Sequence, residues 1–280
     1  MTDFNAKTRL FVDMPLVAQQ RVTLPDAHRH YLVNVMRLAV GAPLTMFNGH
    51  DGEWAGHIAE ISKKQCSVDI AMQIKPQINC LDLWLLFAPV KKARLDFMAQ
   101  KASELGVSCI WPVRTDYCQI SRVNDERLAA NAIEAAEQTE RMDIAAIHEF
   151  TELFSVLDQM EDDRLLIWCD ESSAGSPAHN IAAVLHAAPA HDKAAILIGP
   201  EGGFSPSERK QLAGRKNCLK TLNIQHIQNG LINDQILRII PIQNRICVRR
   251  DQFNLGRIII QGEINSLYAL HRGHQLFGVN

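Results

Sequence analysis

Long apolar runs are absent from this chain of 280 residues. No stretch reaches the roughly 18 consecutive apolar residues that a membrane-spanning helix needs. The first 15 residues, MTDFNAKTRLFVDMP, also lack the apolar segment of a secretory signal peptide. We therefore expect a protein that neither spans a membrane nor is secreted, and a cytoplasmic location.

Paired cysteines are absent as well. The chain has seven cysteines, an odd number, and they are scattered with no C-x-x-C pair. This pattern excludes a disulfide framework and predicts no metal site. The length allows one large domain or two smaller ones, and either can bury a sizeable core without covalent cross-links.

Alanine and acidic residues are scarce in the last quarter of the chain. Residues 1–203 carry 18 Lys+Arg, 27 Asp+Glu and 28 alanines, whereas residues 204–280 carry 11 Lys+Arg, four Asp+Glu and two alanines. The overall formal charge of −2 conceals this asymmetry. Such a break marks a domain boundary, an insertion or a stretch of foreign or misread sequence.

The first 75 residues read as short strands separated by turn residues. Runs of four to eight residues with period-two patterning predict a small antiparallel barrel. One helix interrupts the strands at 26–41, where apolar residues recur at helical spacing and Gly41 follows as a stop.

After a linker at 75–79 the pattern changes to apolar strands alternating with helices. The strands are expected at 83–89, 108–113, 165–171 and 194–203, and the helices at 93–106, 125–141 and 181–188. Continuous apolar strands of this kind form a parallel sheet covered on both faces. The prediction is therefore a β domain at 1–74 followed by an α/β domain at 78–280, with 204–254 atypical.

The segment ILIGPEGGFSPSE at 196–208 is the most informative one. An apolar strand leads into a glycine-bearing loop and then into a helix capped by Ser205 with Pro206 at its first position. Open α/β sheets bind ligands at the carboxyl ends of their strands, although a turn with incidental glycines fits the spacing as well. The segment is neither G-x-G-x-x-G nor a phosphate loop, which excludes dinucleotide and P-loop sites.

Five segments together resemble one protein family. They are RLFV at 9–12, HRHYLVNVMRLAVG at 28–41, KKARLDFMAQKASELGV at 91–107, EAAEQTER at 134–141 and IGPEGGFSPSE at 198–208. In this order they resemble the 16S ribosomal RNA uracil-N3 methyltransferases of the SPOUT class. The resemblance implies a PUA-like or OB-like RNA-binding barrel and a SPOUT domain that holds S-adenosylmethionine in a trefoil knot. It also implies a homodimer that methylates N3 of one uridine in the small ribosomal subunit.

The resemblance assigns roles to particular residues. The residues expected in catalysis are Lys92, Arg94 and Glu104, although a solvated charge run and a helical surface pair are the plainer alternatives. The residues expected to contact RNA are Arg9, His30, Arg37 and Lys91. The residues expected around the cofactor are Cys169, Gly199, Glu201, Gly203, Leu255 and Gly256. Transfer to N3 needs no covalent adduct, so Cys169 is interpreted as a packing residue.

The last segment of the family pattern is not found at its expected place. Residues 255–270 have partial likeness to it, and Leu255 and Gly256 can be aligned. The tail is an insertion before a working last motif, a reading-frame change, or a divergent RNA-binding extension. An RNA-binding protein with an impaired cofactor pocket is therefore the alternative to the methyltransferase.

Overall fold

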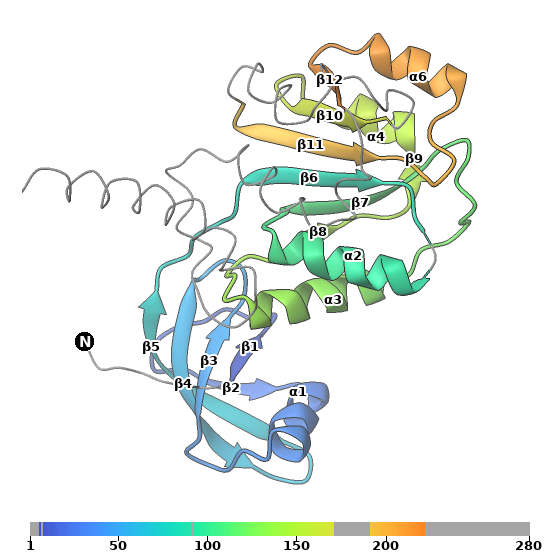
Figure 1. Ribbon diagram of the computed structural model, residues 1–280. Helices are drawn as coiled ribbons and strands as arrows, with labels where there is room; N and C mark the ends of the chain where they lie inside the picture. Colours follow the sequence, from blue (N-terminus) through green and yellow to red (C-terminus); the bar gives the residue numbers. More distant parts are fainter. Residues whose placement is uncertain (1–5, 7, 91, 171–190, 222–280) are drawn as a thin grey trace, which may run out of the picture.

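The computed structural model describes residues 6, 8–90, 92–170 and 191–221 of the chain. These residues form two sheets that follow one another along the chain, one of five strands and one of seven (Figure 1). The first sheet ends at Lys75 and the second begins at Asp82. No described helix is long and apolar enough to cross a lipid bilayer.

The small N-terminal domain is a sheet with the strand order β1-β3-β4-β5-β2. Its elements are β1 (Arg9–Phe11), β2 (Arg21–Leu24), α1 (Asp26–His30), η1 (Tyr31–Val35), β3 (Pro43–Phe47), β4 (Glu53–Ile61) and β5 (Cys66–Lys75). The pairings β2–β5, β3–β4 and β4–β5 are antiparallel, whereas β1 pairs parallel with β3. The arrangement thus differs from the purely antiparallel one expected, because the edge strand β1 runs in the same direction as β3.

The helix of this domain is shorter than the sequence pattern predicts. It runs from α1 directly into the π-helical turn η1 and ends before Met36 instead of at Gly41. Arg37 follows with φ of +54°, and the amide of Leu38 donates a 2.9 Å hydrogen bond to the carbonyl of Leu32. A left-handed residue closes helix ends in this way, usually as glycine. Here an arginine takes that position.

The α/β domain is a parallel sheet with the strand order β12-β10-β11-β6-β7-β8, and β9 pairs with β7. Its strands are β6 (Asp82–Phe87), β7 (Cys109–Arg114), β8 (Ala146–Ile147), β9 (Thr151–Glu152), β10 (Leu165–Cys169), β11 (Lys193–Ile198) and β12 (Cys218–Thr221). Its helices are α2 (Lys92–Glu104), α3 (Asp125–Gln138), α4 (Leu153–Gln159) and α6 (Pro206–Ala213). The predicted strand and helix alternation is confirmed for these elements, and the predicted helix at 181–188 lies outside the described residues.

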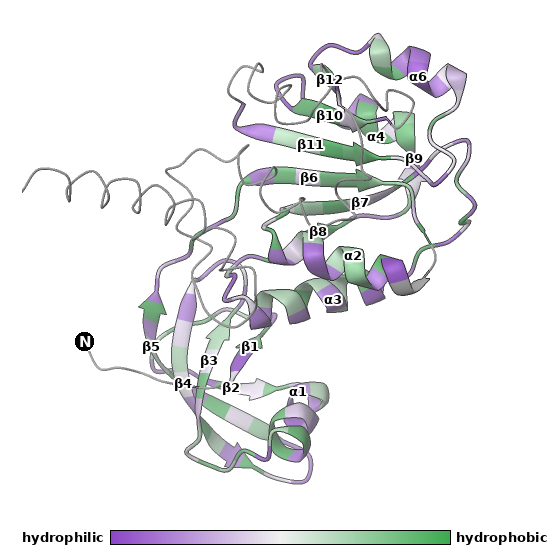
Figure 2. Ribbon diagram, viewed as in Figure 1, coloured by the Kyte–Doolittle hydropathy of each residue, from purple (hydrophilic) through white to green (hydrophobic). Residues whose placement is uncertain are grey.

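Helices cover both faces of this sheet, as its apolar strands require. Leu95 of α2 and Leu128 of α3 belong to the apolar cluster on one face. Val156 of α4 and Leu212 of α6 belong to the cluster on the other. Figure 2 shows the apolar character concentrated along the central strands, with polar residues on α6.

The connections that follow β6 and β11 lead to opposite sides of the sheet, although the two strands are parallel neighbours. After β6 it passes through α2 on one face to β7, and after β11 it passes through α6 on the opposite face to β12. Two neighbouring strands whose connections leave to opposite faces form a topological switch point, where open α/β sheets bind their ligands. The glycine-bearing loop follows β11 at this point.

Candidate functional site at the carboxyl edge of the sheet

The candidate site begins where β6 and β11 part. The amide of Ala88 donates a 2.9 Å hydrogen bond to the carbonyl of Ile198, one step beyond the last paired residues of the two strands. From here the chain turns into α2 on one side and into residues 199–205 on the other. Both loops therefore lie at the carboxyl edge of the sheet.

The glycines of the loop are required by its own packing. A Cβ added to Gly199 would lie 2.6 Å from a ring carbon of Phe204, which is 1% exposed. Gly203 has φ of +69°, a conformation that favours glycine, and an added Cβ would lie 3.2 Å from Nη2 of Arg209. The loop backbone therefore stays free of side chains at both positions. Its predicted contact with a cofactor stays a prediction.

The loop is anchored by the first turn of α6. Ser205 accepts a hydrogen bond from the amide of Glu208, and the Glu208 carboxylate accepts one from the amide of Ser205, which makes a capping box. The same carboxylate accepts a 2.9 Å hydrogen bond from the amide of Asp116 after β7, and the Ser205 hydroxyl donates to the Asp116 carboxylate at 2.5 Å. Glu208 thus joins the loops after β7 and β11.

Arg94 and Glu201 meet across the switch point. Nη1 of Arg94, in the first turn of α2, lies 2.9 Å from Oε1 of Glu201 in the glycine-bearing loop. The two side chains are 72% and 76% exposed, so the pair is solvated. Surface ion pairs contribute about 0–1 kcal/mol, so either group can exchange its partner at little cost. The structure therefore brings together one residue predicted for catalysis and one predicted for cofactor binding.

A buried carboxylate lies at the end of the neighbouring strand. Asp170 directly follows β10 and is 0% exposed. Its Oδ1 lies 3.3 Å from Nε of Arg209 on α6, and its Oδ2 lies 2.9 Å from Nζ of Lys220 on β12. Asp170 thus ties α6 and β12 to the carboxyl end of β10.

Cys169 is the last residue of β10 and is buried. Burial raises the pKa of its thiol to about 11, and the hydroxyl of Thr221 donates a weak hydrogen bond to Sγ at 3.8 Å. The thiolate is the nucleophilic form of cysteine, so this side chain is unreactive at neutral pH. The geometry agrees with the interpretation of Cys169 as a packing residue.

The structure does not bring Glu104 to the switch point. Glu104 is the last residue of α2, ten residues after Arg94, which places it about 15 Å farther along the helix axis. There its carboxylate accepts hydrogen bonds from Gln100 at 2.8 Å and Lys101 at 2.6 Å. The surface-pair alternative fits this geometry better than a catalytic role.

Of the remaining predicted site residues, the structure describes only some. Lys92 is the first residue of α2, close in sequence to Arg94. Lys91, Leu255 and Gly256 lie outside the described residues, as does most of the atypical stretch at 204–254. In its described part, α6 confirms the helix predicted after Ser205, whereas β12 is a strand of the main sheet that was not predicted.

Two of the residues predicted to contact RNA are exposed, and one is not. His30 and Arg37 lie on and after the short helix of the small domain, on its surface. The Arg9 side chain is only 10% exposed and pairs with Glu53 at 2.6 Å. With its bonds to the carbonyls of Ala136 and Arg141, Arg9 lies at the junction of the two domains, and its predicted contact with RNA stays a prediction.

The sequence analysis missed Asp170, Arg209 and Lys220. Asp170 did carry a visible signal, because it directly follows an apolar strand on the edge where ligands bind. Arg209 and Lys220 carried none, since their partner lies 39 and 50 residues earlier in the chain.

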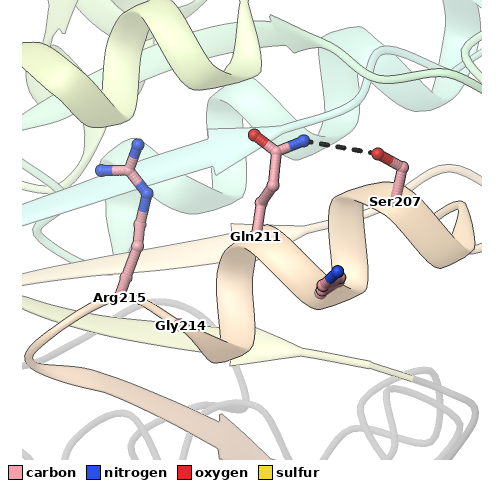
Figure 3. A pocket seen from close by; sticks show the side chains of 5 residues that line it. Ser207, Gln211, Gly214 and Arg215 are labelled. Atoms are coloured by element: carbon pink, nitrogen blue, oxygen red, sulfur yellow. Dashed lines mark hydrogen bonds between the residues drawn. The ribbon is translucent and has the colours of Figure 1, made fainter.

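A shallow hollow of about 600 Å³ lies along α6, away from the switch point. It is lined by Ser207, Lys210, Gln211, Gly214 and Arg215, and Figure 3 shows Gln211 donating to Ser207 within it. Arg215 also donates to the carbonyl of Leu157 at 2.9 Å, which fastens the end of α6 to α4. None of the predicted site residues lines this hollow. Among the described residues no cluster of His, Cys, Asp and Glu is suited to a metal ion.

The raised pKa of Cys169 predicts slow alkylation. With the pKa at about 11, the thiolate forms only as the pH approaches that value. An ordinary thiol has a pKa of about 8.5, so at pH 8 we expect iodoacetamide to modify Cys169 at least a hundredfold more slowly. Peptide mass spectrometry of the folded protein measures this, with the half-exposed Cys80 and Cys118 as internal references. Equal rates at all three would contradict the burial of Cys169.

The paired carboxylate of Asp170 predicts a loss of stability in Asp170→Asn. The amide keeps one acceptor but loses the charge that holds Arg209 and Lys220. We expect the free energy of unfolding to fall by about 1.5–3 kcal/mol, the contribution of a hydrogen bond to a charged group. The control is Asp158→Asn, which breaks the exposed pair with Arg215 and should cost less than about 1 kcal/mol. Urea unfolding measures the free energy of unfolding of both variants. Equal decreases in the two variants would contradict the role given to Asp170.

Comparison with known proteins agrees with this architecture. The family described as the RNA methyltransferase PUA domain matches residues 24–71, and the RNA methyltransferase domain matches residues 76–224. Among solved structures, a protein from Legionella pneumophila in complex with bound SAM has a TM-score of 0.69 and 26% identity, covering 82% of this chain and 96% of that one. Ribosomal RNA small subunit methyltransferase E from Neisseria gonorrhoeae, bound to S-adenosyl methionine, has a TM-score of 0.68 and 23% identity. The match covers 77% of this chain and 88% of that one.

The curated relatives carry the same name. Ribosomal RNA small subunit methyltransferase E of Rickettsia conorii is 32% identical over 210 residues, which are 75% of this chain and 84% of the relative. The protein of the same name from Bacillus subtilis is 24% identical over 191 residues, which are 65% of this chain and 75% of the relative. With both domains matched and most of the relative's length covered, the chain belongs to the family of ribosomal RNA small subunit methyltransferase E.

Proposed function

We propose that this protein transfers a methyl group from S-adenosylmethionine to N3 of a uridine in 16S ribosomal RNA of the small subunit. The observation that carries the proposal is the switch point between β6 and β11, where a glycine-bearing loop meets Arg94 in a chain of this family. The choice of N3 and of uridine comes from the family resemblance. Such an enzyme works where ribosomes are assembled, which supports the cytoplasm as its location.

The chemistry of N3 sets two demands on the site. N3 lies on the Watson–Crick edge of uracil, so the base must be unpaired or flipped out of its helix before a methyl group reaches it. The imide proton must also leave, and the negative charge that develops on the ring is stabilised by a nearby cation or hydrogen-bond donor. A site for this reaction therefore needs an accessible cationic side chain next to the methyl donor.

The loop fits a bound S-adenosylmethionine. Its glycines keep the backbone free of side chains at Gly199 and Gly203, and the loop would hold the cofactor together with the end of β10. The buried hydroxyl of Thr115, at the end of β7, has no hydrogen-bond partner among the described residues. The same edge thus retains an unused polar group. When bound, the cofactor supplies an electrophilic methyl group.

Arg94 is the side chain best placed to stabilise the uracil. It stands at the switch point with 72% of its side chain exposed, and its partner Glu201 is as accessible. Because the ion pair is solvated, the guanidinium can leave Glu201 and donate to a uracil oxygen as charge develops. Lys92, two residues earlier in α2, is the second candidate cation.

A homodimer fits the placement of the two domains. The small domain packs against the carboxyl end of α3, whereas the switch point lies at the other end of the same layer (Figure 1). The exposed His30 and Arg37 therefore lie far from the switch point of their own chain. A second copy can bring its small domain to that edge, so both parts act on one RNA.

The proposal predicts methylation by the purified full chain. Small-subunit RNA incubated with S-adenosylmethionine should gain N3-methyluridine, read by mass spectrometry of its nucleosides. In Arg94→Ala we expect kcat to fall about a hundredfold, the usual effect of removing a donor that stabilises developing charge, with cofactor affinity unchanged. The control Lys193→Ala removes a cation at the amino end of β11, on the opposite edge of the sheet, and should retain activity.

Two outcomes would contradict different parts of the proposal. An active Arg94→Ala variant would remove the role of Arg94 but leave the reaction. A folded wild-type chain that binds RNA without binding S-adenosylmethionine, as calorimetric titration measures, would favour the alternative function, an RNA-binding protein with an impaired pocket.

The molecular mass of the protein in solution tests whether it is a dimer. Sedimentation equilibrium of the full chain should give about 63 kDa, twice the 31.4 kDa of one copy. A mass of one copy at micromolar concentration would contradict the composite site.

A further inference from the structure

Two of the segments that carry the family resemblance, and the end of a third, meet at the junction of the two domains, away from the switch point. They are residues 9–12 and 134–141, and residues 100–106 from the segment at 91–107. The proposed reaction uses none of their polar contacts. Each segment nevertheless places a charged or hydrogen-bonding group in the same small region. These contacts therefore have a role other than catalysis.

Arg9 is the centre of this junction. Its Nε donates to Glu53 at 2.6 Å within the small domain, while Nη1 and Nη2 donate to the carbonyls of Ala136 and Arg141 at 2.7 and 2.8 Å. The guanidinium also lies 3.7 Å from the ring centroid of Phe47. The planar fork of an arginine can satisfy two carbonyls and a carboxylate at once, which a lysine ammonium cannot do in the same geometry.

Further contacts from α3 to the small domain surround Arg9. Glu137 accepts a 2.8 Å hydrogen bond from the amide of Phe11, and burial raises the pKa of this carboxyl group while that hydrogen bond opposes the rise. Lys75, the last residue of β5, lies 2.7 Å from Glu53 and 3.3 Å from Glu140. The first and last strands of the small domain are therefore both fixed to the end of α3.

Arg141 extends the network into the α/β domain. Its side chain is 5% exposed, donates to the carbonyl of Ser103 near the end of α2 at 2.9 Å, and pairs with Asp143 at 2.8 Å. Asp143 in turn accepts a 3.0 Å hydrogen bond from the amide of Cys80 in the linker. The ends of α2 and α3, the linker and β1 are thus joined by one chain of hydrogen bonds.

We propose that Arg9 and Glu137 are positioning residues that fix the orientation of the small domain on the α/β domain. The inference rests on the proposed function, because its purpose is to present RNA at a set place relative to the catalytic edge. A partly buried network of paired charges and hydrogen bonds favours one geometry over others, since a rotation of the small domain leaves buried groups such as Arg9 unpaired.

Glu137 gives the sharpest test. Glu137→Ala removes a negative charge, so a purely electrostatic view predicts equal or tighter RNA binding. The positioning role predicts the opposite: KM for RNA should rise about tenfold, equivalent to about 1.4 kcal/mol, while kcat and cofactor affinity stay unchanged. Glu137→Gln keeps an acceptor for the amide of Phe11 and should retain most of the wild-type KM. Glu134→Ala, on the exposed side of the same helix, is the control.

Arg9 separates positioning from phosphate binding. If Arg9 contacted RNA phosphates, Arg9→Lys would retain most of the affinity, because phosphate contacts need only a positive charge. If it positions the domain, Arg9→Lys should behave like Arg9→Ala. A wild-type KM in Arg9→Lys would overturn the inference, and so would a KM in Glu137→Ala equal to that of Glu134→Ala.

Small-angle X-ray scattering of the full chain tests the inference without any enzymatic activity. Glu137→Ala should have a larger maximum dimension than the wild type and Glu134→Ala, at an unchanged far-ultraviolet circular dichroism spectrum. An unchanged scattering curve would overturn the inference. If the wild type neither binds S-adenosylmethionine nor methylates RNA, the proposed function fails, and the scattering data still decide whether these residues hold the domains.

Discussion

The pairing of β11 between β6 and β10 is the constraint on which the site depends. It sets the carboxyl ends of three strands in one register, so that Ala88, Cys169 and the loop after Ile198 start at the same edge. The connections after β6 and β11 then leave to opposite faces, which makes this edge the switch point of the sheet. Glu208 and Asp170 stabilise the carboxyl edge of the sheet, because each side chain contacts segments that belong to or follow different strands.

The fold could be predicted to a large extent because its signals are local. Apolar strands alternating with amphipathic helices indicate a parallel sheet, and the loop at 199–203 stands out by its glycines. The role of Arg9 could not be found this way. Its partners Glu53, Ala136 and Arg141 lie 44, 127 and 132 residues away, and an arginine in an RNA-binding family is readily interpreted as a phosphate contact. The distance of Glu104 from Arg94 could not be foreseen for a related reason, because helical spacing shows which face a residue occupies but not which end of the helix reaches the site.

Ion pairs within the chain account for several of the positive charges at the start of the basic segment. Beyond residue 204 the sequence turns basic, yet Arg209 and Lys220 pair with Asp170, and Arg215 pairs with Asp158. The family match continues to residue 224, about 20 residues past the compositional break. Cations at the start of the basic segment therefore complement acidic residues of the preceding segment. A local excess of positive charge here does not by itself indicate RNA binding.

The junction and the switch point lie at opposite ends of α2, a helix of 13 residues that is about 20 Å long. The charges of Arg9 and Arg141 are paired with those of Glu53 and Asp143, so their opposing fields nearly cancel at that distance. The network around Arg9 and Arg141 therefore has little effect on the chemistry at Arg94 through its electric field. Its influence must pass through the rigid layer of α2 and α3 and through the orientation of the small domain. An effect of this kind changes where RNA is held and leaves the reacting groups as they were, so it belongs in KM and not in kcat.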